Sequence, residues 1–370
     1  MQPTTICLLV PNLGGGGAER VAVNLANSLT ERNIKVHLVV FKKTGDYWDL
    51  LSRNVKIFSL ESRGGRGRYA IISFIKYLRK EKPESVLAFM EHANLVAIIS
   101  NILIRGKALL VISEHTTISK TKRRKIENII LRAFYPFADK IVTVSKSAAD
   151  DLEKYVNHKK GQITCIYNPI VTSELSVRAR EGSDHPYFKS GVPVILAVGR
   201  LTSQKNLGLL IRAFAKTKRH IKAKLLIIGE GLERGSLQNL VESLQLQEDV
   251  DLAGFQKNPY AYMSRASLVA LSSNYEGLPS VLIEALACGT PVVSTDCESG
   301  PKEILDDGKY GILVPVGDED KLAAALVECL NNLDKHRQMA VNFQREAMHK
   351  FTIDYATEKY LELLGAPHGV

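Results

Sequence analysis

The chain has 370 residues, which is too long for one ordinary core and about right for two α/β domains. Its 45% apolar and 24% charged residues are typical of a soluble globular protein. The formal net charge of +10 is uneven, because residues 1–170 hold 27 Lys and Arg against 14 Asp and Glu, whereas residues 171–370 hold 22 against 25. Any basic partner-binding surface is therefore expected in the first half.

Cysteine usage and apolar runs restrict the location of the protein. The five cysteines are odd in number and form no Cys-x-x-Cys pair, which argues against a disulfide framework and a structural zinc site. Residues 6–10 lack the basic segment that precedes a signal-peptide core, and residues 95–104 are half as long as a membrane span. We therefore expect a cytoplasmic protein, either free or peripheral on a membrane.

The first half alternates between strand and helix patterns. A βαβ unit is predicted at the start of the chain, with strands at residues 6–10 and 36–41 and an amphipathic helical pattern at 18–29 between them. Further strands are predicted at residues 55–60, 85–89, 109–113, 140–144 and 163–167, with helical patterns between most of them. This alternation predicts a mostly parallel, doubly wound α/β sheet.

The alternation stops at residues 171–192, which are polar and show no period, and we interpret them as a linker. It restarts with strands predicted at residues 194–198, 224–228, 250–252, 268–271, 291–294 and 312–314. The sequence thus predicts an α/β domain at residues 1–170 and another at residues 193–350. Residues 351–370 contain a final helical pattern that we expect to pack back toward the first domain.

Two glutamates follow, in the chain, the buried strand predicted at residues 268–271. Glu276 follows the carboxyl end of that strand, and Glu284 lies inside the helix that begins near Pro279. Ligands of open α/β sheets bind at these strand ends, so the two carboxylates can reach different parts of one extended ligand. The alternative, two solvated glutamates on a helix surface, stays open on spacing alone.

Two loops carry groups suited to phosphate. Residues 14–17 are four glycines that let the backbone approach a ligand, and Gly15 and Gly16 precede a helix N-terminus that favours anions. The run matches neither the dinucleotide fingerprint nor the P-loop. Behind the first strand of the second half, Arg200 and Lys205 can both address a diphosphate. A tight turn and solvated cations are the alternatives.

A histidine follows the strand predicted at residues 109–113. His115 can hydrogen-bond a ligand hydroxyl or exchange a proton there. A satisfied structural histidine is the alternative, and His92, behind the preceding strand, is the competing candidate.

Two segments combine cations with an apolar face. Residues 118–134 start with a cationic cluster that includes Lys122, Arg123, Arg124 and Lys125, and residues 63–68 lead into a similar pattern at 71–80. Such segments suit anionic membrane surfaces or phosphates. No nucleic-acid recognition motif accompanies the charge. Helices with solvated cationic faces are the alternative.

Taken together, these motifs resemble the family 4 (group 1) retaining glycosyltransferases, which have the GT-B architecture of two facing Rossmann-like, doubly wound domains with a cleft between them. The resemblance covers nearly the whole chain. It rests on residues 14–19, Val198-Gly199-Arg200 with Lys205-Asn206, Ile228-Gly229-Glu230-Gly231, and residues 273–291 with the two glutamates.

The resemblance implies a role for each matching residue in the second half. Arg200 and Lys205 would stabilise the departing diphosphate, work that metal ions do elsewhere. Glu276 would hold hydroxyls of the donor sugar, and Glu284 would bind the ribose. Three further positions would complete the donor site, namely Gly229 and the backbone N–H groups of Gly277 and Leu278.

In the first half, the resemblance implies that His115 contacts the donor sugar. Gly15 and Gly16 would border the diphosphate and the acceptor. Asp318-Glu319-Asp320 matches the D-x-D pattern of metal-dependent sugar transferases, but it opens a helix, where acidic residues act as caps, and we assign no metal.

The implied activity is a retaining, metal-independent transfer of a hexose or N-acetylhexosamine from a UDP-sugar, which is a substrate rather than a cofactor. The implied acceptor is a saccharide on polyprenyl diphosphate, in surface polysaccharide or glycan assembly. Residues 1–170 would bind this acceptor and residues 193–350 the donor. The protein would lie on the cytoplasmic face of the cell membrane, held by its N-terminal basic helices.

One segment departs from the family pattern. Residues 296–305 lack the two glycines that many relatives have before Pro-Glu, and they are similar to a subset that includes galactose and N-acetylgalactosamine transferases. The alternatives are a soluble transferase acting on a free sugar, a sugar phosphate or a glucan, and an epimerase of the same build. A third is a non-catalytic protein of this fold that binds carbohydrate or a membrane surface.

Overall fold

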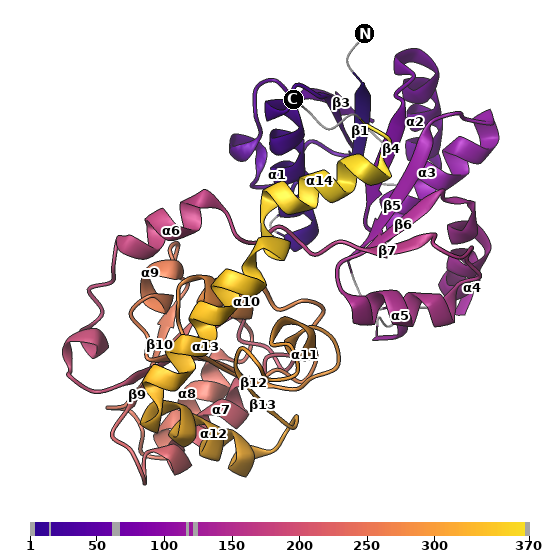
Figure 1. The fold of residues 1–370 in the computed structure, drawn as a ribbon. Helices are drawn as coiled ribbons and strands as arrows, with labels where there is room; N and C mark the ends of the chain where they lie inside the picture. The colour runs from indigo at the N-terminus through magenta and orange to yellow at the C-terminus, as the bar shows by residue number, and fades with distance from the viewer. Residues whose placement is uncertain (1–3, 15, 61–66, 116–117, 121–124, 367–370) are drawn as a thin grey trace. The chain divides into compact units, whose positions relative to one another are not determined.

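The computed structural model describes the chain except for residues 1–3, 15, 61–66, 116–117, 121–124 and 367–370 (Figure 1). It divides into two compact units. The first comprises Met1–Pro169 together with Thr352–Val370, and the second comprises Ile170–Phe351.

The first unit contains a seven-stranded sheet in the order β3-β2-β1-β4-β5-β6-β7, and each neighbouring pair is parallel. The strands are β1 (Thr5–Val10), β2 (Lys35–Val40), β3 (Lys56–Ser59), β4 (Ser85–Phe89), β5 (Leu109–Glu114), β6 (Lys140–Thr143) and β7 (Ile163–Cys165). The helices are α1 (Gly17–Glu31), α2 (Gly67–Glu81), α3 (Glu91–Ile104), α4 (Lys125–Phe134), α5 (Lys146–Tyr155) and α14 (Ile353–Leu363). Short 3₁₀ helices in the described residues of this unit are η1 (Trp48–Leu50), η3 (Ile118–Lys120) and η4 (Tyr135–Phe137).

Alternate side chains of β1 pack into the two hydrophobic cores of this unit, one on each face of the sheet. Ile6, Leu8 and Val10 pack with α1 and α14, whereas Cys7 and Leu9 pack with α2 and α3. Because strand side chains point to opposite faces in turn, a strand that is apolar throughout must be covered by helices on both sides. The sheet is accordingly a buried central layer (Figure 1).

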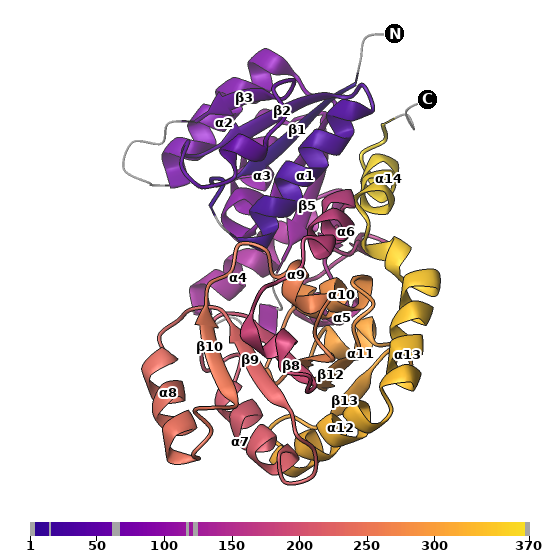
Figure 2. The ribbon, with the colours of Figure 1, turned by 90° about the vertical axis from the view of Figure 1, so that its left-hand side faces the viewer.

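The second unit contains a six-stranded parallel sheet in the order β10-β9-β8-β11-β12-β13 (Figure 2). The strands are β8 (Val194–Val198), β9 (Lys224–Ile228), β10 (Val250–Gly254), β11 (Leu268–Leu271), β12 (Val292–Thr295) and β13 (Ile312–Val314). The helices are α6 (Ser173–Arg180), α7 (Leu207–Thr217), α8 (Arg234–Ser243), α9 (Tyr260–Met263), α10 (Ser280–Ala287), α11 (Pro301–Ile304), α12 (Glu319–Asn331) and α13 (Leu333–Glu346), with 3₁₀ helices η5 (Pro186–Lys189) and η6 (Met348–Phe351). Helices α7, α8 and α12 cover one core, and α10 packs against β11 and β12.

These two sheets confirm the doubly wound architecture that the alternation predicts. Residues 171–192, which we interpret as a linker, contain α6 and η5 and lie within the second unit. Helix α6 packs against α9. It buries a single side chain, Leu175, so its sequence carries no apolar period that could have predicted a helix.

The last helix, α14, packs against α1 of the first unit (Figure 1). The Thr357 hydroxyl donates to Ser28 Oγ at 3.0 Å in a buried contact, and Arg32 pairs with Asp354 at 3.0 Å near the surface. Residues 352–366 are thereby part of the first core. No helix in the described part of the chain has the length and apolar character needed to cross a bilayer.

Candidate functional site

The strand order of the second sheet reverses between β8 and β11. From β8 the sheet continues through β9 and β10 on one side, and from β11 through β12 and β13 on the other. Ligands of such sheets bind outside the carboxyl ends of the strands at this reversal. The loop 199–206 follows β8 and the loop 272–279 follows β11, so the structure brings Arg200, Lys205 and Glu276 to this position.

Backbone and amide hydrogen bonds join these two loops. The Asn274 N–H donates to the Gln204 carbonyl at 2.8 Å, and its Nδ2 donates to the Ser203 carbonyl at 2.8 Å. Asn206 Nδ2 in turn donates to Asn274 Oδ1 at 3.0 Å. These contacts link segments about 70 residues apart and hold the side chains between them in register.

Lys205 and Glu276 form an ion pair between the loops. Lys205 Nζ lies 2.5 Å from Glu276 Oε1, and the two side chains are only 17% and 8% exposed. A Cβ atom at Gly199 would lie 3.2 Å from Lys205 Cε, so a glycine there leaves room for the lysine stem. The pair is therefore a shielded contact in which each charge compensates the other.

Arg200 is placed differently from Lys205. Arg200 is exposed, and its guanidinium has no hydrogen-bond or ion-pair partner among the described residues. A planar guanidinium free to move can bind a diphosphate through two parallel hydrogen bonds. The loop thus offers one exposed cation beside one that is already paired.

Backbone donors lie next to the carboxylate. The N–H groups of Gly277 and Leu278 donate to no described residue, and they directly precede α10. Gly300 packs against this turn with a φ of +94°, and a Cβ there would lie 2.4 Å from Pro279 Cδ. The segment 296–305, which departs from the family pattern, therefore supports this turn by close backbone packing.

Glu284 lies in the middle of α10, about one turn after the start of that helix, and is partly buried. Burial, with a further contribution from the Glu284 charge, raises the pKa of the Cys288 thiol to about 12. Glu276 and Glu284 thus stand before and within one helix, as the sequence predicts.

Two glycines follow β9 in the chain, and the loop that follows β8 packs so closely against them that neither position has room for a side chain. Gly229 has a φ of +142°, and its Cβ would lie 1.9 Å from the Gly199 carbonyl oxygen. At Gly231 a Cβ would lie 2.3 Å from the Leu201 carbonyl oxygen. Gly229 therefore shapes the loop that carries Arg200.

His115 lies at the carboxyl end of β5 in the first unit. Its Nε2 is 3.1 Å from Ser113 Oγ, and its buried Nδ1 has no hydrogen-bond partner among the described residues. Burial lowers the pKa of the His115 imidazole to about 4, so the ring is neutral at physiological pH. His92, the competing candidate, is exposed in the first turn of α3.

The glycine loop leads into α1. Gly16 is the N-cap residue of that helix, no side chain caps it, and a Cβ there would lie 2.4 Å from Glu19 Oε2. Gly15 lies outside the described residues. The arrangement leaves the N-terminus of α1 without a side-chain cap, as expected for a loop that presents backbone N–H groups.

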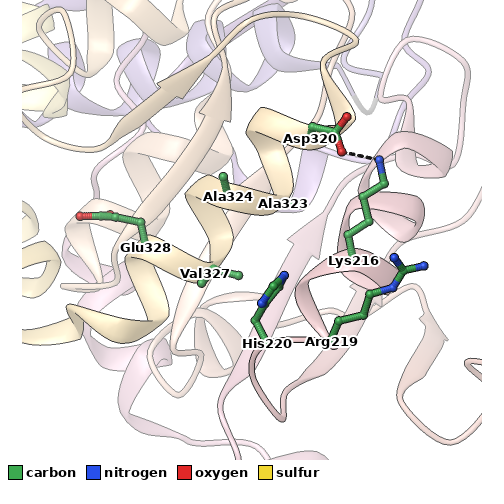
Figure 3. Close-up of a pocket in the computed structure, with 8 residues that line it drawn as sticks. All are labelled: Lys216, Arg219, His220, Asp320, Ala323, Ala324, Val327 and Glu328. Atoms are coloured by element: carbon green, nitrogen blue, oxygen red, sulfur yellow. Dashed lines mark hydrogen bonds and ion pairs between the residues drawn. The ribbon is translucent and has the colours of Figure 1, made fainter.

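Asp318 caps α12 by accepting a hydrogen bond from the Lys321 N–H at 2.9 Å, which confirms the predicted capping role. Nearby, a surface hollow of about 640 Å³ lies between α7 and α12 (Figure 3). Lys216 and Arg219 line its α7 side, and Lys216 bonds to Asp320. None of the predicted site residues lines this hollow.

Two buried hydroxyls near Glu276, those of Ser273 and Thr295, are not indicated by any sequence motif. Ser273 donates to Glu276 at 2.6 Å, and Thr295 donates to the Ser273 carbonyl at 2.7 Å. The only signal for them is their position, since each lies at or just beyond the carboxyl end of an apolar strand. Hydroxyl residues are common there for many reasons, so position alone does not reveal the contact.

Family models match both halves of the chain. The model described as Glycosyltransferase Family 4 matches residues 15–174, and the model described as Glycosyl transferases group 1 matches residues 182–346.

Relatives of known name match nearly the full chain. One, from Campylobacter jejuni, is the N-acetylgalactosamine-N,N'-diacetylbacillosaminyl-diphospho-undecaprenol 4-alpha-N-acetylgalactosaminyltransferase, which is 32% identical over 96% of this chain and 98% of the relative. A second from that organism, the GalNAc-alpha-(1->4)-GalNAc-alpha-(1->3)-diNAcBac-PP-undecaprenol alpha-1,4-N-acetyl-D-galactosaminyltransferase, is 30% identical over 97% and 98%. The crystal structure of Anabaena Alr3699/HepE in complex with UDP has the same fold, with a TM-score of 0.82, 21% identity and coverage of 98% and 100%.

Proposed function

Because the chain belongs to family 4 (group 1) of the glycosyltransferases, we propose that it moves a hexose or N-acetylhexosamine from a UDP-sugar to a saccharide on polyprenyl diphosphate. The names of the two Campylobacter relatives, both N-acetylgalactosaminyltransferases acting on undecaprenol-linked saccharides, support this acceptor class. The UDP bound to the Anabaena protein supports the nucleotide. The reaction we propose retains the anomeric configuration and needs no metal ion.

The observation that carries this proposal is the Lys205–Glu276 pair at the strand reversal, with the exposed Arg200 in the same loop. Negative charge develops on the diphosphate as the sugar leaves, and preorganised donors stabilise it best. Arg200, Lys205 and the N–H groups of Gly277 and Leu278 provide such donors, which is the work a metal ion does in other transferases.

The two glutamates bind the neutral parts of the donor. Glu276 Oε1 faces Lys205, so the other carboxylate oxygen is available to accept a hydrogen bond from a sugar hydroxyl. Glu284, about one turn into α10, is suited to the ribose hydroxyls of the same nucleotide. Neither is required as a covalent nucleophile, since the departing diphosphate can accept the proton of the acceptor hydroxyl.

His115 acts in this proposal as a neutral hydrogen-bonding group. Its low pKa, caused by burial, means that the imidazole carries no charge above about pH 5. One ring nitrogen is held near Ser113, and the other is left for a hydroxyl of the donor sugar.

We also propose that the protein binds the cytoplasmic face of the cell membrane through the first unit. Helix α4 and the adjoining η4 expose Ile126, Ile129 and Phe137, which are 55%, 61% and 60% accessible. Exposed Arg132 lies on the same helix, and this unit carries the basic half of the chain. Apolar side chains beside cations are suited to an anionic bilayer surface.

Transfer is tested by release of UDP and by product analysis with lipid-linked and free saccharide acceptors. We expect Glu276→Gln and Arg200→Ala to lower kcat by roughly 100-fold or more, because each removes a charge that binds the reacting groups. Arg219→Ala, which removes another exposed cation of the same unit, is the matched control and should leave turnover unchanged. Near-normal turnover of Glu276→Gln would overturn the assignment. NMR of the product reports the anomeric configuration, and unchanged activity in EDTA supports metal independence.

Membrane binding is tested by flotation with vesicles that contain an anionic phospholipid. Ile126→Ser and Ile129→Ser together should weaken binding by roughly tenfold or more, since each removes an apolar side chain that would enter the bilayer surface. Val177→Ser on α6 is the matched control, because Val177 is similarly exposed at 64% but lies in the second unit. Equal flotation of the double variant and the control would contradict the proposed surface.

A further inference from the structure

We propose that Ser273 is a positioning residue that holds the Glu276 carboxylate in place for sugar transfer, an inference that rests on the proposed function. Ser273 Oγ donates to Glu276 Oε1 at 2.6 Å. The same carboxylate oxygen receives Lys205 Nζ at 2.5 Å. Two donors from two different loops therefore converge on one oxygen, and they fix the position of that oxygen.

Ser273 is itself held by the core. Its side chain has no solvent-accessible surface, and its carbonyl oxygen accepts a hydrogen bond from Thr295 Oγ1 at 2.7 Å. Thr295 ends β12, the neighbour of β11, and is also fully buried. The serine hydroxyl is thus supported by the adjacent strand and cannot exchange its partner for water.

The preceding residue holds the other partner of the ion pair. Ser272 Oγ donates to the backbone carbonyl of Lys205 at 2.9 Å and is likewise buried. The consecutive residues Ser272 and Ser273 therefore fix the main chain of the cation and the side chain of the carboxylate. This arrangement sets the distance between Lys205 and Glu276.

The Ser273 hydrogen bond matters most when the nucleotide-sugar donor binds. A diphosphate that binds Lys205 competes with Glu276 for that ammonium group. Ser273 then remains as the donor that keeps the largely buried carboxylate oriented, because a buried polar group without a partner is costly. The second carboxylate oxygen makes neither of these two contacts and is left to accept a sugar hydroxyl.

The test compares Ser273→Ala with Ser294→Ala, a matched control. Ser294 is also fully buried, but its hydroxyl bonds only to the Thr295 carbonyl among the described residues. We expect Ser273→Ala to lower kcat by roughly ten- to hundredfold, the effect of losing a hydrogen bond to a charged group. The affinity for UDP alone, measured by calorimetry, should stay within about twofold, since Ser273 acts on the sugar-binding carboxylate and not on the nucleotide.

A double-mutant cycle separates positioning from a general structural role. In the Glu276→Gln background, Ser273→Ala should cause no further loss of turnover, because the group that it orients has already lost its charge. A structural defect would instead add to the Glu276→Gln loss and weaken UDP binding, and it would overturn the proposal. Ser273→Thr, which keeps the hydroxyl, should recover activity relative to Ser273→Ala.

A conservative variant covers the case in which Ser273→Ala unfolds. Thr295→Val keeps the volume but removes the hydroxyl that supports the Ser273 carbonyl, so it should lower kcat in the same direction and by less. Unchanged kcat of both Ser273→Ala and Thr295→Val, while Glu276→Gln collapses, would overturn the positioning role alone. Normal turnover of Glu276→Gln would overturn the proposed function as well.

Discussion

Removing the Lys205 charge and removing the Glu276 charge should lower the stability of the second unit by different amounts. Lys205→Met keeps the aliphatic stem but leaves the Glu276 carboxylate, which is only 8% exposed, without its counter-ion. Glu276→Gln leaves a cation on a flexible stem that is 17% exposed and can turn toward water. We therefore expect Lys205→Met to destabilise the second unit more than Glu276→Gln does.

The size of this effect follows from the geometry. Removing one partner of a buried ion pair costs about 3–5 kcal/mol, and partial exposure of Lys205 favours the lower end, about 3 kcal/mol. For Glu276→Gln we expect about 1 kcal/mol, because the amide still accepts a hydrogen bond from Ser273. The double variant should cost little more than Glu276→Gln, which leaves a coupling of about 3 kcal/mol.

Calorimetry and urea unfolding of the full chain measure these differences. At about 2–4 °C per kcal/mol for a unit of this size, Lys205→Met should lower the unfolding midpoint of the second unit by roughly 6–12 °C. The Lys216→Met variant is a control, because Lys216 pairs with Glu319 and Asp320 but is 35% exposed, and it should be far less destabilising than Lys205→Met. A Lys205→Met variant as stable as wild type, or a Glu276→Gln variant less stable than Lys205→Met, would refute the reasoning.

Two other predictions concern His115 and Gly229. The folded-state pKa of His115, about 4, is below its ordinary value of 6.5, so the unfolded chain binds the extra proton and stability of the first unit falls as pH drops from about 6.5 toward 4. His115→Asn should remove that part of the loss, on the order of 3 kcal/mol, in unfolding experiments at pH 7 and pH 4.5, and an unchanged pH dependence would contradict it. Gly229→Ala should destabilise the second unit by about 2 kcal/mol or more, because its φ of +142° and the nearby Gly199 carbonyl exclude a Cβ. Gly235→Ala, at an open position in α8, is the control and should be neutral or slightly stabilising; equal effects of the two would argue against strain at Gly229.

Part of the site could be predicted from the sequence because it depends on local features. A four-residue apolar run such as residues 268–271, bounded by polar residues, favours a buried strand, so Glu276 after it was expected at a strand end. The capping role of Asp318 was equally local, since a carboxylate after a glycine and before a helix has a nearby N–H to accept from.

Other features were invisible because they depend on partners remote in the chain. The sequence predicts a linker at residues 171–192, where α6 lies, since a helix that buries only Leu175 has no apolar stripe. The free ring nitrogen of His115 and its low pKa depend on how tightly the first core closes around the imidazole. No pattern of neighbouring residues encodes that degree of burial.

The sequence by itself determined the order of strands and helices and which side chains follow each strand, because apolar periodicity and helix caps act over a few residues. Only the tertiary structure decided that β8 lies beside β11, and with it that Lys205 meets Glu276 across 71 positions. The central strands β8, β9 and β11 are all largely apolar and buried, so hydrophobic burial alone does not select a neighbour. The strand order comes from packing all the helices at once, and it converts two separate loops into one site.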